Sequence, residues 1–142
     1  MKISTRGTYA LRMLIDLAQN QGDGYVCLGE LCERQNISRK YLDQITPLLQ
    51  KDGILTSCRG NCGGFRLALA PENVTAARVL RLTEGSLGPV DCVKSDNDCE
   101  KCDICPVYPL WQGLEKAITD YLESVTLHDL IRQNENGDAH QC

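Results

Sequence analysis

The chain has 142 residues, of which 42% are hydrophobic and 24% are charged, a composition typical of globular proteins in water. No apolar stretch approaches the roughly 18 residues that a membrane span requires. The first residues carry three basic side chains ahead of a short apolar run that Asp16 breaks, so they do not form a secretory signal. We therefore expect a single cytoplasmic domain with an appended element.

Charge is divided unevenly along the chain. Residues 1–66 hold nine Lys/Arg and six Asp/Glu, a balance of +3, and residues 67–142 hold six and thirteen, a balance of −7; together they make the net −4. Phosphate binding depends on the local field rather than on the total charge. The first half can therefore bind nucleic acid, although accidental segregation of surface charge would give the same numbers.

Apolar periodicity in the first half predicts three helices. They span residues 5–20, residues 28–34, and a segment that opens at an N-capping Ser38 and stops at Gly53. Pro47 lies inside the third helix and should kink it. A short helix, a tight turn and a second helix with a polar face are typical of a helix-turn-helix, and also of an ordinary αα-hairpin.

A β-hairpin is expected directly after these helices. Residues 54–59 and 65–69 read as strands on either side of a glycine-rich loop. A phosphate-cradling loop would need a helix after the glycines, and a strand pattern follows instead. A hairpin in this position is a wing, so the fold class is mainly α with a small β-hairpin, a winged helix-turn-helix.

The second half predicts a fourth helix from an N-capping Thr75 to about Thr83, and a long amphipathic helix over residues 107–125. Thr126 should cap a last short turn.

Four of the nine cysteines lie in an acidic loop between these two helices, at Cys92, Cys99, Cys102 and Cys105. Gaps of two residues let successive thiolates converge on one centre, as in ferredoxin-type runs. In a reducing compartment such thiols are metal ligands or redox centres rather than disulfides. We predict an iron–sulfur cluster; structural zinc with four cysteines and a metal-free thiol or disulfide switch remain open.

The remaining cysteines and the histidines suggest no further site. Cys27, Cys32 and Cys58 are expected to be core residues, and Cys62 should be exposed at the tip of the wing. The two histidines are isolated, and no Ser/His/Asp or Cys/His arrangement is visible. We therefore expect no enzyme.

Several separate motifs resemble the IscR/NsrR/CymR superfamily of winged-helix regulators. They are residues 1–10 (MKISTRGTYA), 37–44 (ISRKYLDQ), 57–60 (SCRG) and 63–65 (GGF), followed by the cysteine loop and Leu110-Trp111. The resemblance covers about residues 1–130. It implies a homodimeric repressor or activator that binds a pseudo-palindromic operator in double-stranded DNA.

The resemblance also assigns metal ligands. Cysteines spaced like Cys92, Cys99 and Cys105 hold the cluster in those relatives. Two kinds of fourth ligand occur there, a histidine and a carboxylate from the other subunit, and this chain has Tyr108 and Thr8 at the matching positions. Cys102 is then the local candidate. The spacing does not decide between a two-iron and a four-iron cluster; we favour the two-iron form.

For DNA, the family's recognition helix corresponds to residues 38–44 of this chain and its wing contact to residues 59–60. This correspondence predicts that eight residues contact bases or phosphates: Ser38, Arg39, Lys40, Tyr41, Asp43, Gln44, Arg59 and Gly60. Lys2 and Arg6 are further candidates for backbone contacts.

The long helix would be the dimerisation helix, with a stripe of Leu110, Leu114, Ala117, Ile118, Tyr121, Leu122 and Val125. An intramolecular core helix is the alternative. The predicted organisation is a DNA-binding head at 1–85, a cluster-binding loop at 86–106, the dimerisation helix with a terminal helix at 107–133, and a disordered tail at 134–142.

The predicted function is regulation of transcription in response to iron or cluster status, oxygen or nitric oxide. An electron carrier would need the same cysteines but no wing. A metal-free or zinc-binding, thiol-responsive regulator that acts partly through a protein partner is the other alternative.

Overall fold

The computed structural model describes residues 2–61, 63–94 and 99–137. These form helices α1 (Thr5–Asn20), α2 (Leu28–Gln35), α3 (Arg39–Lys51), α4 (Ala76–Glu84), α5 (Tyr108–Ser124) and α6 (Leu127–Glu135), with strands β1 (Leu55–Cys58) and β2 (Gly64–Leu67). Single 3₁₀ turns lie at η1 (Pro71–Asn73), η2 (Asp91–Val93) and η3 (Cys102–Ile104). The predicted fold class is confirmed.

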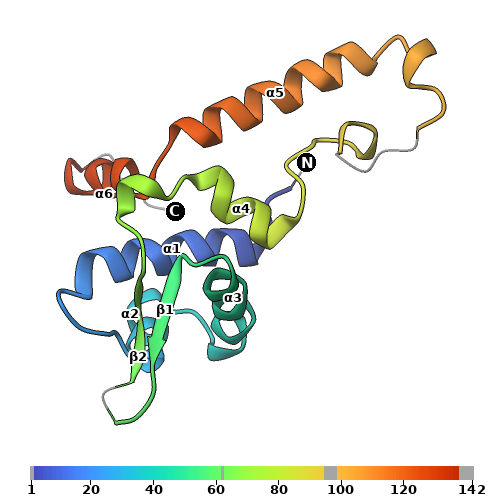
Figure 1. Ribbon diagram of the computed structural model, residues 1–142. Coiled ribbons are helices and arrows are strands. Elements are labelled where there is room, and N and C mark those ends of the chain that lie inside the picture. Colours follow the sequence, from blue (N-terminus) through green and yellow to red (C-terminus); the bar gives the residue numbers. More distant parts are fainter. Residues whose placement is uncertain (1, 62, 95–98, 138–142) are drawn as a thin grey trace.

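Helix α1 runs through the middle of the molecule, with α2 and α3 on one side and α4 on the other (Figure 1). The centre of its apolar stripe is fully buried because it meets side chains from both sides. Helical residues with no exposed surface come from α1 (Ala10, Met13, Leu14, Leu17), α2 (Leu31), α3 (Leu42, Ile45, Leu49), α4 (Ala77, Val79) and α6 (Leu127). The core is aliphatic, as the composition requires.

Helix α6 is bound back onto the head. The backbone N–H of Leu127 donates to the Val74 carbonyl at 2.9 Å, and that of Ala76 donates to the Val125 carbonyl at 2.8 Å. Thr126 forms a capping box with Asp129, so a nine-residue helix replaces the short turn that the sequence predicted. Helix α6 ends at Glu135, two residues inside the predicted tail, and residues 138–142 lie outside the described residues.

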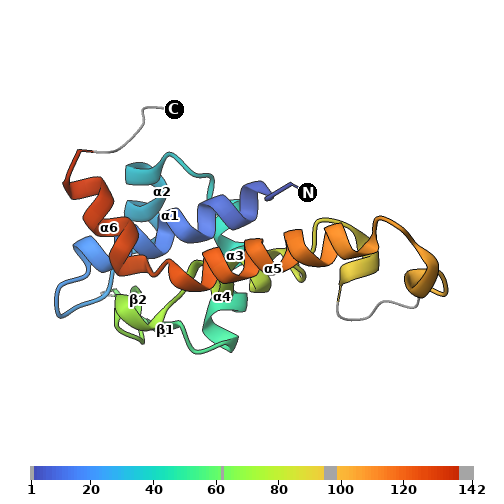
Figure 2. The same cartoon turned by 90° about the horizontal axis from the view of Figure 1, so that it is seen from above.

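Helix α5 lies outside the core. It contains no buried residue, and only Ile118 and Leu122 pack against the cluster formed by Ala77, Leu80 and Leu87. Viewed from above, α5 crosses over α4 and extends beyond the head toward the cysteine loop (Figure 2). One face of a long amphipathic helix therefore has no covering within the described chain.

Ser38 takes the predicted N-cap position of α3, without a capping hydrogen bond from its side chain, and the helix continues through the exposed Pro47. The prediction of core cysteines was wrong for Cys27 and Cys58, which are exposed, whereas Cys32 is half-buried and packs against the core. The first two lie outside the core because Cys27 is at an N-cap and Cys58 is on the outer end of β1. Cys62 lies outside the described residues.

The wing is tied to the head where Val26 bridges Phe65, with the Val26 N–H donating to the Phe65 carbonyl and the reverse, both at 2.8 Å. This contact needs a glycine at position 64. A Cβ on Gly64 would lie 2.2 Å from the Val26 carbonyl oxygen and 2.9 Å from the Cys27 nitrogen. The hairpin is therefore held by a close approach of two backbones.

We expect Gly64→Ala to lower the free energy of unfolding by about 1–3 kcal/mol, because the added methyl group must push two backbones apart. Chemical denaturation at neutral pH measures the change. Gly29→Ala is the matched control: its new Cβ meets only the Cys27 Sγ, at 3.9 Å, and a helical alanine should raise stability by up to about 1 kcal/mol. Equal stability of the two variants would contradict the close approach.

Candidate nucleic-acid interface and cysteine loop

Helix α3 presents a polar face to solvent. All six residues that the sequence assigned to DNA contact on this segment are exposed: Ser38, Arg39, Lys40, Tyr41, Asp43 and Gln44. Arg39 and Asp43 lie 3.8 Å apart as an i,i+4 pair, with side chains 72% and 58% exposed. Such a pair is weak and solvent-screened, so Arg39 can leave it to reach a phosphate or a base edge.

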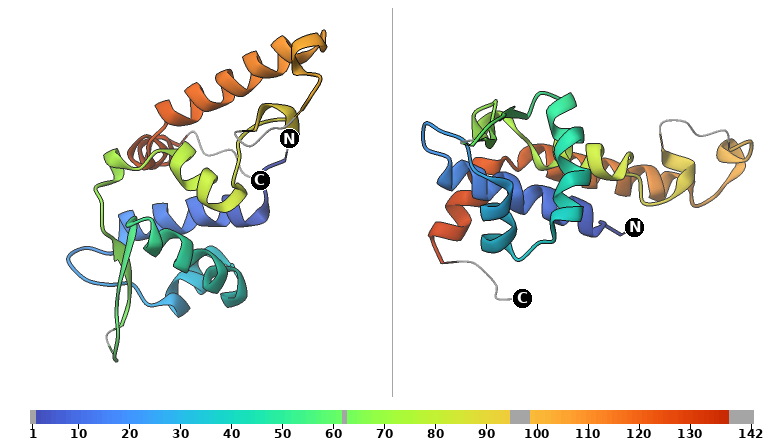
Figure 3. Two further views of the ribbon diagram at one scale, coloured as in Figure 1. Left: turned by 45° about the vertical axis from the view of Figure 1, so that its right-hand side comes forward. Right: turned by 90° about the horizontal axis from the view of Figure 1, so that it is seen from below.

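The two strands of the wing extend from the head beside α3 (Figures 1 and 3). Arg59 and Gly60, the predicted wing contacts, are exposed where the loop leaves β1. The Gln50 side-chain amide of α3 donates to the Ser57 hydroxyl of β1 at 2.8 Å. Recognition helix and wing are thus joined directly, and they face solvent as one unit.

The turn between α2 and α3 depends on a left-handed residue. Asn36 has φ +51° and ψ +47°, a conformation that asparagine tolerates better than most side chains. The Ile37 N–H then donates to the Cys32 carbonyl at 3.1 Å, and the chain turns into α3.

A buried ion pair fixes this turn against α1. The Asp16 carboxylate is 2% exposed and accepts from the Arg34 guanidinium at 2.6 Å and from the Gln35 amide at 2.8 Å. Burial raises the pKa of Asp16, but the hydrogen bonds from Arg34 and Gln35 outweigh it and hold this pKa below its usual value. In the sequence, the only sign of this role is that Asp16 interrupts an apolar run.

Two further residues of α1, Tyr9 and Arg12, lie next to the interface, and no sequence motif predicted them. The Tyr9 ring meets the Tyr41 ring, and Arg12 lies over Tyr9 with its guanidinium carbon 5.6 Å from the ring centroid. Arg6, a predicted backbone contact, instead donates to the Thr83 carbonyl of α4 at 3.0 Å.

The four loop cysteines lie on or beside the two 3₁₀ turns. Cys92, Cys102 and Cys105 are half-buried, Cys99 is exposed, and none forms a disulfide. Four thiols without disulfides in a sparsely apolar loop suit a thiophilic centre as a donor set. Among the described residues, however, no three His, Cys, Asp or Glu side chains converge into a metal-binding group.

Tyr108, at the start of α5, lies beside this loop. Partial desolvation raises the pKa of its phenol above the usual value, and the charge and hydrogen bond of Cys102 act in the same direction. The weaker contribution of Cys92 places both cysteines near the same ring. The start of α5 therefore lies close to two of the predicted ligands.

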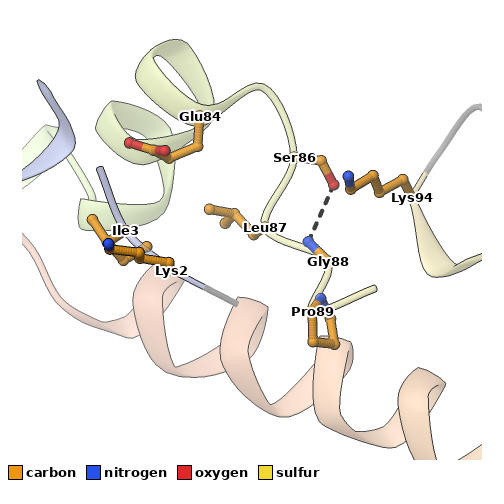
Figure 4. A pocket seen from close by; sticks show the side chains of 8 residues that line it. All are labelled: Lys2, Ile3, Glu84, Ser86, Leu87, Gly88, Pro89 and Lys94. Carbon is orange, nitrogen blue, oxygen red and sulfur yellow. Dashed lines mark hydrogen bonds between the residues drawn. The ribbon is translucent and has the colours of Figure 1, made fainter. Parts of the chain in front are cut away.

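A pocket of about 230 Å³ separates the N-terminal segment from the loop (Figure 4). Lys2 lies on one side and Lys94 on the other, with the Leu87 side chain between them. Nearby, the Ser4 hydroxyl donates to the Glu84 carboxylate at 2.5 Å. The end of α4, from which the cysteine loop departs, is thus hydrogen-bonded to the start of α1.

The chain matches the model of the Rrf2 family, described as "Iron-dependent Transcriptional regulator", over residues 3–133. It belongs to the Rrf2 family. The match spans the head, the cysteine loop and α5, so the predicted superfamily is confirmed.

Individual relatives agree with this assignment. A helix-turn-helix-type transcriptional regulator of Neisseria meningitidis serogroup A is 38% identical over 98% of this chain and 93% of its own length. The structure of IscR from T. potens has a TM-score of 0.77 at 32% identity, covering 100% of this chain and 94% of that one. CymR of B. subtilis, titled the global cysteine regulator, has a TM-score of 0.75 at 32% identity, covering 93% and 97%.

This Rrf2 protein is therefore a transcriptional regulator with a DNA-binding winged helix. Its relatives are named as transcriptional regulators, in agreement with the prediction that it is no enzyme. IscR and CymR are both among them, so family membership alone does not choose between a cluster and a thiol mechanism. In the described ranges, no helix is long and apolar enough to cross a membrane.

We expect Asp16→Asn to lower the free energy of unfolding at pH 7 by about 1–3 kcal/mol, since it removes charged hydrogen bonds to Arg34. The depressed pKa means that ionised Asp16 stabilises the fold at neutral pH, and this contribution disappears as pH falls through the native pKa. The difference from the parent chain should therefore shrink below about pH 4.

Asp43→Asn is the matched control, because its ion pair is exposed and should contribute less than about 0.5 kcal/mol. Denaturation curves recorded from pH 3 to pH 7 measure both variants. A pH-independent difference for Asp16→Asn would show that its charge is not what holds the turn.

Proposed function

We propose that this protein is a cytoplasmic, homodimeric transcription regulator whose cysteine loop binds an iron–sulfur cluster and thereby alters operator binding. The observation that carries the proposal is the loop itself: four cysteines lie between α4, which belongs to the DNA-binding head, and α5, which packs on α4 through one face and leaves the other exposed. The ligands would be Cys92, Cys99, Cys105 and Cys102, with a two-iron cluster preferred.

The DNA contacts would come from α3 and the wing, through Ser38, Arg39, Lys40, Tyr41, Asp43, Gln44, Arg59 and Gly60. Their exposure on one connected unit supports this assignment. In a dimer, two such heads would meet adjacent major grooves about 34 Å apart on a pseudo-palindromic operator. A small change in head spacing would then alter affinity strongly.

The cluster would act by ordering the loop. One end of the loop begins at Glu84 and Gly85, beside the hydrogen bond that joins Glu84 to the start of α1. The other end begins α5. Ordering the segment between them would therefore bias how the head sits relative to the dimer helix. Iron limitation, oxygen or nitric oxide would reverse the effect by removing the cluster.

The dimer would form through the uncovered face of α5. Leu110, Leu114 and Tyr121 are 62%, 41% and 67% exposed, and Ala117 is exposed between them. Ile118 and Leu122 face α4, and Val125 is half-buried at the end of the helix. Beside Tyr121 lies an apolar pocket of about 200 Å³, bounded by Ile3, Leu80 and Leu87, which a partner side chain could fill. A solvent-exposed stripe of this kind is typical of an interface.

A second candidate is a metal-free or zinc-binding, thiol-responsive regulator that acts partly through a protein partner. Two observations favour it: within the described ranges the cysteines form no three-ligand group, and CymR is among the similar structures. The two candidates share the fold and the DNA interface. They differ in what the loop thiols hold.

Protein purified without air from iron-replete cells should contain iron and acid-labile sulfide in equal amounts and absorb visible light. Cys92→Ser and Cys105→Ser should each lose most of the iron, because each removes a ligand. The cluster-loaded and cluster-free forms should shift an operator duplex in gel-retardation assays at different concentrations.

Cys27→Ser is the control for the cysteine variants, since Cys27 is exposed on the head and belongs to no proposed ligand set. Colourless protein that holds zinc or no metal would reject the cluster and favour the second candidate. Equal operator affinity of the loaded and unloaded forms would reject the switch while leaving the cluster intact.

Leu114→Glu should convert the dimer to a monomer, since it places a charge in the centre of the exposed stripe on α5. Sedimentation velocity measures the mass directly. Lys116→Glu adds the same side chain two residues along the helix, outside the stripe, and should leave the mass unchanged. A parent chain that sediments as a monomer at every concentration would contradict the interface.

A further inference from the structure

Tyr41 stands at the edge of the recognition surface. It occupies the first turn of α3, is 38% exposed, and no hydrogen bond joins its hydroxyl to another group in the described chain. Its ring packs edge-on against Tyr9 of α1, with centroids 5.2 Å apart and ring planes at 81°. The Tyr41 ring therefore rests on Tyr9 of α1, while part of the side chain stays exposed to solvent.

Tyr9 is itself held in place by Arg12. The Arg12 guanidinium carbon lies 5.6 Å from the Tyr9 ring centroid, and its Nε donates to the Gln35 side-chain oxygen at 3.2 Å. A second nitrogen of Arg12 donates to the Gln35 backbone carbonyl at the end of α2. Arg12 is thus committed to the helix-turn-helix turn, and Tyr9 is clamped between Arg12 and Tyr41.

We infer that Tyr9 is a positioning residue for DNA binding: its ring holds Tyr41 in the orientation in which the Tyr41 hydroxyl donates to a backbone phosphate of the operator. The inference rests on the proposed placement of α3 on DNA. Tyr9 is half-buried, and in this inference it acts through Tyr41.

The physical basis is restriction of the free side chain. A tyrosine on a helix surface must give up rotamer freedom when it binds, which costs affinity. Edge-to-face packing against Tyr9 limits this freedom before DNA arrives. Phosphate contacts set the register of a protein on the duplex. Removing the Tyr9 ring should therefore weaken binding on all sequences alike.

The test measures affinity, by fluorescence anisotropy, for a duplex that the parent chain selects from a random-sequence library. Tyr9→Leu should weaken binding by about three- to tenfold, and Tyr9→Phe, which keeps the ring, should bind like the parent. In a Tyr41→Phe background, Tyr9→Leu should have no further effect, since the hydroxyl that it positions is already gone.

Salt dependence separates this role from a charge contact. Tyr9→Leu should leave the slope of log affinity against log salt unchanged, whereas Arg39→Gln should reduce it by about one. Thermal unfolding of each variant, measured in parallel, shows that affinity is compared between folded proteins.

Tyr25→Leu is the matched control. Tyr25 is 39% exposed and also carries an arginine over its ring, Arg66 at 5.7 Å, but its stacking partner is not in α3. Any loss of affinity caused by Tyr25→Leu should therefore be the same in the parent and in the Tyr41→Phe background.

Two results would overturn the inference. One is an equal loss in the parent and Tyr41→Phe backgrounds, and the other is a loss with Tyr9→Phe as large as with Tyr9→Leu. Failure of the parent chain to select any duplex would reject the proposed DNA placement itself, a different outcome from either.

Discussion

The burial of α1 between two layers is the constraint on which the rest of this structure depends. Ala10, Met13, Leu14 and Leu17 have no exposed surface, and their burial positions α2 and α3 beneath α1 and α4 above it. Asp16 is the charged residue among the buried residues of α1, and its ion pair with Arg34 of α2 holds the helix-turn-helix turn against α1. A charge buried this deeply is tolerated only when it is paired, so the core also fixes the orientation of the recognition helix.

The DNA-binding head and helix α5 differ in how they are stabilised. The head closes around its own core, which includes Leu127 of α6, so both the first and the last helix belong to it. Helix α5 packs on the head through Ile118 and Leu122, and its Glu123 pairs with Arg81 of α4, while Leu110, Leu114 and Tyr121 stay exposed. An isolated amphipathic helix gains little stability from its own hydrogen bonds. Helix α5 therefore has far less tertiary packing to stabilise it than the head has.

Periodicity predicted this architecture well because apolar spacing reports directly which face of a helix is buried. It located α1, α4 and α5 to within a residue or two, and the capping residues Thr75 and Thr126 were recognised by type. Periodicity did not predict contacts between residues that are far apart in the sequence. Nothing local reveals that Tyr9 meets Tyr41, or that the outer end of the hairpin leaves Cys58 in solvent. The four loop thiols were visible as a motif, but spacing does not determine how they converge.

Coupling between the loop and the head must pass through few contacts. The Ser4 hydroxyl reaches Glu84, Arg6 reaches the Thr83 carbonyl, and Gly7 leaves room for the Glu84 carboxylate, which a Cβ there would meet at 2.6 Å. These contacts join the start of α1 to the residues immediately before the loop. Coupling free energy is reciprocal, so an operator that prefers one loop state must stabilise that state to the same extent. If a group held by the loop alters operator binding, as proposed above, its retention should therefore depend on whether the head is bound to DNA.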